Sequence, residues 1–345
     1  MLRVKDIQGL TFAELTTFGV GGTISRVREC GYALEVQDAI KEAKAAGRPW
    51  MVVGGGSNLL ASSGPYDGDV IRLRGLNHMY WDKQEVRVGA GVVWDELVRQ
   101  SVEKGFAGLE CMSGIPGEVG GGVVQNVGAY GQEVSAALVE VDVYDADEDD
   151  FLSLSPAECK YAYRSSIFKA NPRYVVLGAT MRLAHAGATV RVDYTELQRE
   201  IGKDKASVSE VRAAVLRTRA RKGMVVDAAD ADTRGAGSFF TNPIVDAAAA
   251  DKLLAEHPAC PRYEAGDGKA KLAAAWLIES AGFARGGRRG AVGQSTKHAL
   301  ALVNRGGATG EEVWKYAREI AEAVQSKFGV RLSPEPVAVG LPPFS

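Results

Sequence analysis

Glycine is unusually frequent in this chain, and its distribution limits the folds that the chain can adopt. The sequence has 41 glycines among 345 residues, whereas an average protein has about 7%. Many of them gather at positions 54–56, 114–131 and 235–237. A flexible linker would carry glycine throughout its length, but grouped glycines let a backbone approach a ligand closely. The sequence therefore predicts a globular protein with ligand sites built from backbone.

Hydrophobic periodicity predicts a mixture of helices and strands. We expect helices at 35–46 and 95–104, each ended by a glycine. We expect strands at 50–53, 138–146 and 174–183, and a strand with the turn that follows it at 86–94. Capping boxes at Ser207 with Glu210 and at Thr309 with Glu312 predict two further helices. The pattern divides the chain into two αβ modules that meet near residues 207–220, with no internal repeat.

Composition excludes several classes of protein. The formal net charge of −2 gives no general attraction to nucleic acid or to an anionic membrane. The four cysteines and four histidines lack metal-ligand spacing, so we expect reduced cysteines and no metal. No apolar run is long enough for a signal peptide or a membrane span. We expect a cytoplasmic protein, and a monomer because no long exposed apolar pattern is visible.

Two glycine segments indicate a phosphate-bearing ligand. GGGSNLL (54–60) follows the expected strand at 50–53, so the amides of a tight turn would face a ligand there. Its spacing matches neither GxGxxG nor GxxxxGK[ST], and alone it also fits an ordinary turn. The second segment, residues 113–131, is too long for a turn. A large, flat cofactor that carries phosphate would explain both segments.

A third segment, GAGSFFTNP (235–243), places Ser238 between a glycine and two phenylalanines. A hydrolase would need the nucleophile elbow GxSxG. The residues two positions from this serine are Ala236 and Phe240, so the elbow is absent. Ser238 is therefore not expected to be a hydrolase nucleophile, and taken alone it also fits an ordinary loop hydroxyl.

Six motifs in this order resemble those of the UDP-N-acetylenolpyruvoylglucosamine reductases, the MurB family of peptidoglycan precursor synthesis. They are TFGVGG (17–22), VVGGGSNLL (52–60), GIPGEVGGGVVQNVGAYG (114–131), YRSSIFK (163–169), GSFFTNP (237–243) and the PEP near the C-terminus. The resemblance covers nearly the whole chain. It implies an α+β fold, with a two-part FAD-binding module of the vanillyl-alcohol-oxidase (PCMH) type followed by an αβ substrate-binding domain. The implied domains are 1–72 and 73–206 for FAD and 207–332 for substrate, with 333–345 returning near the active site.

The resemblance also implies the reaction and the residues. NADPH would reduce a non-covalently bound FAD, which would then reduce UDP-N-acetylglucosamine enolpyruvate to UDP-N-acetylmuramate. Ser238 matches the family's proton donor, and Arg164 and Glu335 match its other catalytic residues. The implied FAD contacts are Gly54, Gly55, Gly56, Ser57, Asn58, Leu59, Gly114, Ile115, Pro116, Gly117, Gly120, Gly121, Asn126, Gly128, Ala129 and Tyr130. The implied substrate contacts are Tyr163, Tyr194, Lys222, Asn242, Tyr263 and His298, with Tyr194 on a loop that closes over the substrate.

Other interpretations are open at this point. We interpret Arg217, Arg219 and Arg221, beside Lys222, as cations that complement a helix dipole. A flavin oxidase on the same cofactor fold would react with oxygen, and a regulator without catalysis would bind flavin or nucleotide sugar but would not turn over. The arginine site at Arg164 and the GSFFTNP motif disfavour the oxidase. The presence of Ser238, Arg164 and Glu335 together disfavours the regulator.

Overall fold

The computed structural model describes residues 5–344. Within this range the chain separates into two compact units. The first unit contains residues 5–10, 24–56 and 66–225, and the second contains residues 11–23, 57–65 and 226–344. Helix α7 (Val208–Arg221) belongs to the first unit, which therefore extends beyond residue 206. The assignment of three functional domains stays a prediction.

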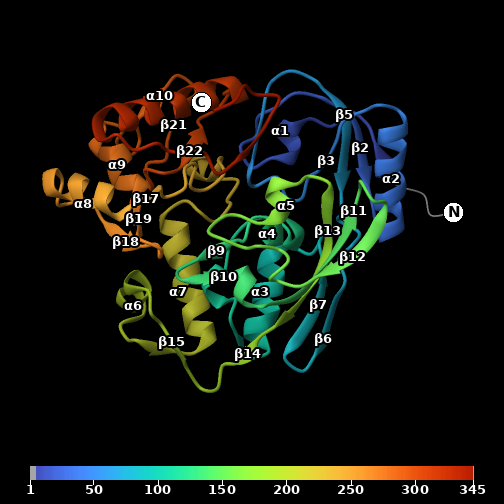
Figure 1. The fold of residues 1–345 in the computed structure, drawn as a ribbon, viewed down its shortest axis with the longest axis horizontal. Helices are drawn as coiled ribbons and strands as arrows, with labels where there is room; N and C mark the ends of the chain where they lie inside the picture. Colours follow the sequence, from blue (N-terminus) through green and yellow to red (C-terminus); the bar gives the residue numbers. More distant parts are fainter. Residues whose placement is uncertain (1–4, 345) are drawn as a thin grey trace. The chain divides into compact units, whose positions relative to one another are not determined.

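A four-stranded sheet opens the first unit, with the order β1-β2-β5-β3 (Figure 1). The strands are Lys5–Ile7, Ile24–Glu29, Tyr66–Arg72 and Trp50–Val52, and all but the antiparallel β1 are parallel. The expected helix at 35–46 is α2 (Ala33–Ala45), which joins β2 to β3 and packs against the sheet through buried Val36 and Ile40. Gly47 follows it with φ +64°, a backbone conformation that favours glycine.

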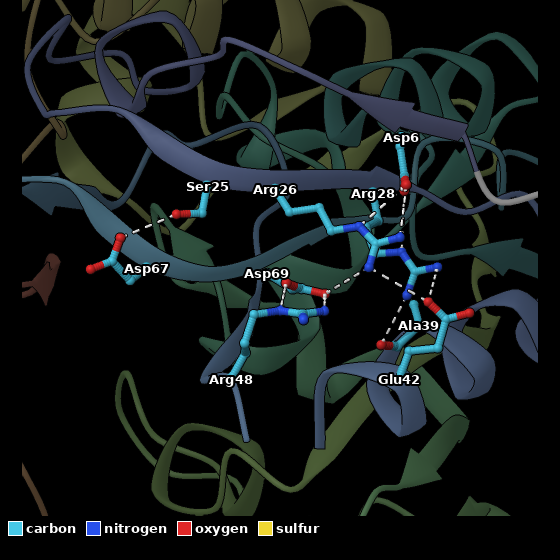
Figure 2. A network of polar contacts seen from close by, with 9 residues as sticks. All are labelled: Asp6, Ser25, Arg26, Arg28, Ala39, Glu42, Arg48, Asp67 and Asp69. Atoms are coloured by element: carbon cyan, nitrogen blue, oxygen red, sulfur yellow. Dashed lines mark hydrogen bonds and ion pairs between the residues drawn. The ribbon is translucent and has the colours of Figure 1, made fainter. Parts of the chain in front are cut away.

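Charged side chains tie this sheet to α2 (Figure 2). Asp69 of β5 is fully buried and accepts hydrogen bonds of 2.8 and 3.1 Å from Arg48. Arg28 of β2 is also buried, and it pairs with Glu42 of α2 at 2.8 Å. A buried charge without a partner would destabilise the fold by several kcal/mol, roughly 3–5. The Arg28–Glu42 pair therefore links the sheet to α2, and the Arg48–Asp69 pair links the sheet to the segment that follows this helix.

The second sheet of the first unit is antiparallel, with the order β12-β11-β13-β7-β6. Its strands are Asp150–Leu154, Leu138–Asp145, Tyr174–Arg182, Glu85–Gly89 and Met79–Asp82. We expected β13 to alternate between buried and exposed residues, but most of it is buried. Val176 and Ala179 pack with Val88, while Val175 and Leu177 pack with residues of α2. The strand is covered on both faces, which explains its nearly continuous apolar sequence.

Shorter elements complete the first unit. The expected helix at 95–104 is α3 (Trp94–Glu103), followed by Gly105 with φ +73°. The predicted capping box of Ser207 and Glu210 opens α7. The remaining elements are β8 (Phe106–Ala107), α4 (Val119–Val124), β9 (Gly128–Ala129), β10 (Gln132–Glu133), α5 (Ile167–Ala170), β14 (Ala184–His185), β15 (Val190–Arg191), α6 (Thr195–Ile201) and β16 (Lys205–Ala206).

The longest helix of the second unit is α10 (Gly310–Phe328) (Figure 1). The predicted capping box of Thr309 and Glu312 is present, and Val313, Ile320 and Val324 form its buried face. That face joins a core that includes Phe239 and Phe240. The sheets of this unit have the orders β17-β19-β18, β20-β21-β22 and β23-β4. The elements are α1 (Phe12–Leu15), β4 (Leu59–Ala61), β17 (Ile244–Asp246), α8 (Ala247–Glu256), β18 (Arg262–Glu264), β19 (Lys269–Leu272), α9 (Ala274–Ser280), β20 (Arg288–Arg289), β21 (Val292–Gln294), β22 (Leu302–Asn304) and β23 (Val337–Val339).

Candidate active site

The two glycine segments expected to hold a cofactor meet inside the first unit. A Cβ added to Gly55 would lie 2.9 Å from the Cα of Gly117, so any side chain at this position would push the segments apart. A Cβ at Gly54 would lie 3.1 Å from a carboxylate oxygen of Glu118, which is buried and 3.6 Å from Arg74. Glycine is therefore required here by close approach of the two segments.

Backbone donors are available at the first segment. Among residues 5–344, no hydrogen bond uses the amides of Gly54, Gly55 or Gly56 as donors. Gly56 has φ +63°, and a tight turn of this kind directs successive amides to one side. Gly56 is buried and Gly54 and Gly55 are half-buried. Because an unpaired amide shielded from water is costly, these groups fit a ligand with anionic oxygens. The residues present therefore suit the pyrophosphate of FAD.

The second segment continues into a strained loop. Asn126 and Tyr130 have φ of 48° and 50°, a region that residues other than glycine seldom adopt. The side chain of Asn126 fixes this conformation, because its amide donates to Glu133 and to the carbonyl of Ala162, each at 2.9 Å. Its oxygen accepts from the amide of Ser135. Strain of this kind is kept where the surroundings enforce it, commonly at functional sites.

Arg164 lies against this loop. It sits in a turn closed by reciprocal backbone hydrogen bonds between Ala162 and Ser165, and its φ is 53°. Its guanidinium donates to the carbonyls of Asn126 at 3.3 Å and Gly128 at 2.5 Å. It also lies 5.1 Å from the centre of the Tyr163 ring. The structure thus brings two sequence-predicted site residues, Tyr163 and Arg164, to the expected cofactor loop.

Tyr130 connects this loop to the expected substrate residues of the first unit. Its ring meets that of Tyr194 edge to face at 5.2 Å, and the Nζ of Lys222 is 6.0 Å from its centre. Burial raises the pKa of Tyr130 to about 12, so its hydroxyl stays protonated at neutral pH. Lys222 forms a 2.6 Å ion pair with Glu196 in the first turn of α6.

The three arginines before Lys222 differ from one another. Arg217 and Arg221 are exposed and both pair with Glu200, rather than serving only the helix dipole as we expected. Arg219 is buried and donates to the carbonyl of Met224 at 3.0 Å. Its Nε has no hydrogen-bond partner among the described residues, and burial lowers its pKa. Arg219 therefore brings a poorly compensated charge beside Gly114, where a Cβ would lie 3.7 Å from Nε.

Ser238 occupies the second unit, at the end of a glycine turn. Gly237 has φ +66°, and the half-buried serine precedes two phenylalanines that are inserted in the core. The turn is held from two sides, because Thr17 donates to the carbonyl of Gly235 at 2.6 Å and the amide of Phe239 donates to the carbonyl of Leu300 at 2.8 Å. The serine therefore lies on a fixed backbone.

Glu335 lies beside the Ser238 segment in the second unit. Its amide donates to the carbonyl of Phe239 at 2.8 Å. The side chain of Asn58 donates to the carbonyl of Glu335 at 3.1 Å, and β23, which follows, pairs with β4. Segments 57–61, 237–240 and 333–339, far apart in the sequence, are thus joined.

The other predicted substrate residues also lie in the second unit. The oxygen of Asn242 accepts a hydrogen bond of 2.9 Å from the amide of Ala274, at the start of α9. His298 is half-buried, and its carbonyl accepts from the amide of Ala301, in the same turn that holds Phe239. Tyr263 is exposed on β18 and pairs in register with Lys271.

Two family models and several named proteins match this chain. Residues 24–149 match the family model of the FAD binding domain, and residues 229–339 match that of the C-terminal domain of UDP-N-acetylenolpyruvoylglucosamine reductase. The reductase of Thermobifida fusca (strain YX) is 43% identical over 348 residues, covering 97% of this chain and 98% of that protein. The chain belongs to the UDP-N-acetylenolpyruvoylglucosamine reductase family. The reductase of Streptomyces coelicolor is also 43% identical, over 352 residues and 98% and 91% of the two chains.

A solved structure confirms the fold. The crystal structure of the reductase from Thermus caldophilus matches with a TM-score of 0.66 and 26% identity, covering 98% of this chain and 100% of that one. The expected α+β fold with an FAD-binding module is therefore confirmed. The chain is an FAD-dependent oxidoreductase of peptidoglycan precursor synthesis.

Within residues 5–344, none of the helices combines the length and the hydrophobicity needed to cross a bilayer. The same part of the chain contains no group of three or more metal-ligating side chains placed to hold an ion.

Several residues near these segments could not be identified from the sequence. Glu196 follows Tyr194 in DYTEL, yet nothing in the sequence shows that it would meet Lys222. Asp232 is buried and binds both Arg305, at 2.7 Å, and Thr296. Thr296 lies 64 residues further along the chain, so a single sequence gives no signal for this contact.

Proposed function

We propose that this protein reduces the enolpyruvyl ether of UDP-N-acetylglucosamine enolpyruvate to give UDP-N-acetylmuramate, with NADPH as the hydride source. The observation that supports it most directly is the pairing of the Ser238 and Glu335 segments through the 2.8 Å hydrogen bond from Glu335 to Phe239. A serine and a carboxylate on one rigid framework suit proton delivery to a substrate carbon. The 43% identity to named reductases over nearly the full chain supports the substrate.

FAD held by the glycine segments would supply the hydride chemistry, with NADPH as the source of the hydride. The terminal methylene of the enolpyruvyl group becomes a methyl group when hydride adds to it. The pair of electrons from the double bond then resides on the neighbouring carbon and spreads into its carboxylate. That carbon must take up a proton to complete the reduction.

We propose that the hydroxyl of Ser238 delivers this proton. A hydroxyl is a weak acid, but an enolate carbon is a strong base, so a correctly positioned serine can protonate it. The serine alkoxide then regains a proton through water. The positive φ of Gly237 supports this role, because it lets the chain turn and present the hydroxyl without a side chain in the way.

Arg164 and Glu335 have complementary roles in the proposal. The guanidinium of Arg164 stabilises the negative charge that develops on the substrate, and its hydrogen bonds to the loop carbonyls keep it in position. Glu335 serves as the acid-base group near the substrate carboxylate. Tyr163, Tyr194, Lys222, Asn242, Tyr263 and His298 bind the nucleotide sugar, with Lys222 at the diphosphate.

The FAD residues inferred from the family follow the glycine segments. Gly54–Gly56 lie in the first unit and Ser57–Leu59 in the second. Gly114, Ile115, Pro116, Gly117, Gly120, Gly121, Asn126, Gly128, Ala129 and Tyr130 lie in the first unit. We further propose that the enzyme is cytoplasmic and monomeric.

Anaerobic absorbance spectra test this function. The purified protein should show a flavin band that NADPH bleaches and that returns when the enolpyruvyl nucleotide sugar is added. A band that returns only when air is admitted would identify an oxidase. A flavin band that NADPH leaves unchanged would indicate a binding protein without this activity.

A further inference from the structure

Four side chains of the first unit form a cluster that we call the Lys222 cluster: Tyr130, Tyr194, Glu196 and Lys222. The Nζ of Lys222 is 2.6 Å from a carboxylate oxygen of Glu196, and about a third of each side chain is exposed (32% and 38%). Tyr130 lies between Lys222 and Tyr194, through contacts of 6.0 and 5.2 Å. Solvent, and therefore a ligand, can reach the ion pair.

The charges around this cluster do not cancel. Burial raises the pKa of Tyr130. The positive charge of Arg219 lies close enough to the phenol to lower this pKa, but its effect is smaller than that of burial. No carboxylate among the described residues forms an ion pair with Arg219, since Asp95 pairs bidentately with Arg212. Arg219 therefore adds a positive charge near Tyr130, and Asp95, the carboxylate whose charge acts on Arg219, is already paired with Arg212. Glu196 is the ion-pair partner of Lys222. An anion with more charge than one carboxylate would suit this cluster.

We propose that Glu196 is an internal substitute for the substrate diphosphate, and that binding replaces its carboxylate on Lys222 with the diphosphate. This inference rests on the proposed function, which assigns Lys222 to the diphosphate. A diphosphate offers more acceptor oxygens and more negative charge than Glu196, so it can displace the carboxylate into solvent. The exchange lowers the affinity for the nucleotide sugar and eases release of the product.

The exchange also acts on Tyr194. Tyr194 is the N-terminal cap residue of α6, and Glu196 belongs to the first turn of the same helix. The ion pair with Lys222 fixes this turn to α7 in the free enzyme. When the diphosphate takes Lys222, the turn that carries Tyr194 is no longer held by that ion pair and can adjust to the ligand.

Titration calorimetry with UDP, on the holoenzyme, tests this inference. Glu196→Gln removes the competing charge and should bind UDP about two- to five-fold more tightly than wild type, the range expected for a partly exposed ion pair. Binding of uridine, which lacks the diphosphate, should not change. In a Lys222→Met background the same substitution should give no gain, because the pair no longer exists.

Glu200→Gln is the matched control, because Glu200 lies on the same helix and pairs with Arg217 and Arg221 instead. It should leave UDP affinity within about 1.5-fold of wild type, since charges at those exposed arginines are screened. Unchanged or weaker UDP binding by Glu196→Gln would overturn the inference, as would an equal gain in the Lys222→Met background. If the wild-type enzyme reduces the enolpyruvyl sugar, the proposed function stands whichever binding result is found. If the wild-type enzyme does not reduce this sugar, the proposed function is itself wrong.

Discussion

The backbone amide of Glu335 donates a 2.8 Å hydrogen bond to the carbonyl of Phe239, the residue after Ser238. Phe240 and Pro334 form a bridge next to it, and the amide of Thr241 donates to the carbonyl of Ser333. The segment that carries Ser238 and the segment that carries Glu335 are therefore paired through their backbones. Main-chain hydrogen bonds, rather than side-chain contacts, set their relative position.

Asp232 is expected to stabilise the framework that carries Ser238. Its carboxylate binds Arg305 and Thr296, and both charged side chains are buried, with 6% and 10% of their surface exposed. Asp232→Asn should lower the free energy of unfolding by about 3 kcal/mol at pH 7, because it leaves Arg305 without its buried partner. Urea denaturation measures this. Asp246→Asn, which removes an exposed pair with Lys269, should cost less than about 1 kcal/mol.

The effect of Asp232 should also depend on pH. Burial alone would raise its pKa, but the hydrogen bonds from Thr296 and the charge of Arg305 outweigh burial and lower it. A lowered pKa in the folded state means that the stabilisation is complete above the pKa of the unfolded chain, about 3.9. It is lost as the pH falls through the folded value. The difference between wild type and Asp232→Asn should therefore shrink below about pH 4; a constant difference would contradict the assignment.

Gly55→Ala is expected to weaken FAD binding. The added Cβ would approach the Cα of Gly117 to 2.9 Å, and separating the two glycine segments should raise the dissociation constant of FAD by about tenfold or more. Titration of the apoprotein with FAD, followed by flavin fluorescence, gives this constant. Gly64→Ala is the control, since a Cβ there meets nothing nearer than 3.8 Å. Equal FAD affinities for the two variants would argue against a cofactor held between these segments.

Arg164→Lys should lower kcat by about 100-fold, since lysine keeps the charge but cannot donate in the same way to both loop carbonyls and the substrate. Steady-state kinetics measure the change. Arg182→Lys should retain wild-type kcat, because Arg182 is an exposed arginine of β13 paired with Glu85. A kcat for Arg164→Lys within a few-fold of wild type would exclude a catalytic role for the guanidinium.

Much of the local structure follows from the sequence. The capping boxes at Ser207 and Thr309 and the glycines after α2 and α3 mark helix ends correctly, because these signals act within a few residues. The same kind of box at Thr11 and Glu14 opens α1, which we did not predict, since α1 is only one turn long and shows no periodicity. Helix ends are therefore predictable where a local capping signal accompanies a periodic pattern.

Long-range pairing could not be predicted from periodicity. Residues 57–65 belong with the second unit because β4 pairs with β23, next to the contact of Asn58 with Glu335, 277 residues later. Asn126 and Arg164 both have positive φ, and their side chains donate to backbone carbonyls 36 to 38 residues away in the sequence. The family motifs predicted Asn58, Asn126, Tyr130, Arg164 and Glu335 as site residues, but they did not predict these contacts. The ion pair of Lys222 with Glu196 appears only in the folded chain.

The most direct test of the proposed mechanism is Ser238→Ala in anaerobic stopped-flow experiments that separate the two half-reactions. NADPH should bleach the flavin at the wild-type rate, because the serine has no part in that step. Return of the flavin band after addition of the enolpyruvyl nucleotide sugar should slow by about 10²–10⁴-fold, the range for loss of a general acid. Return of the flavin band at the wild-type rate would contradict the assignment of Ser238 as proton donor. Loss of both half-reactions, flavin reduction by NADPH as well as reoxidation by the sugar, would also contradict it.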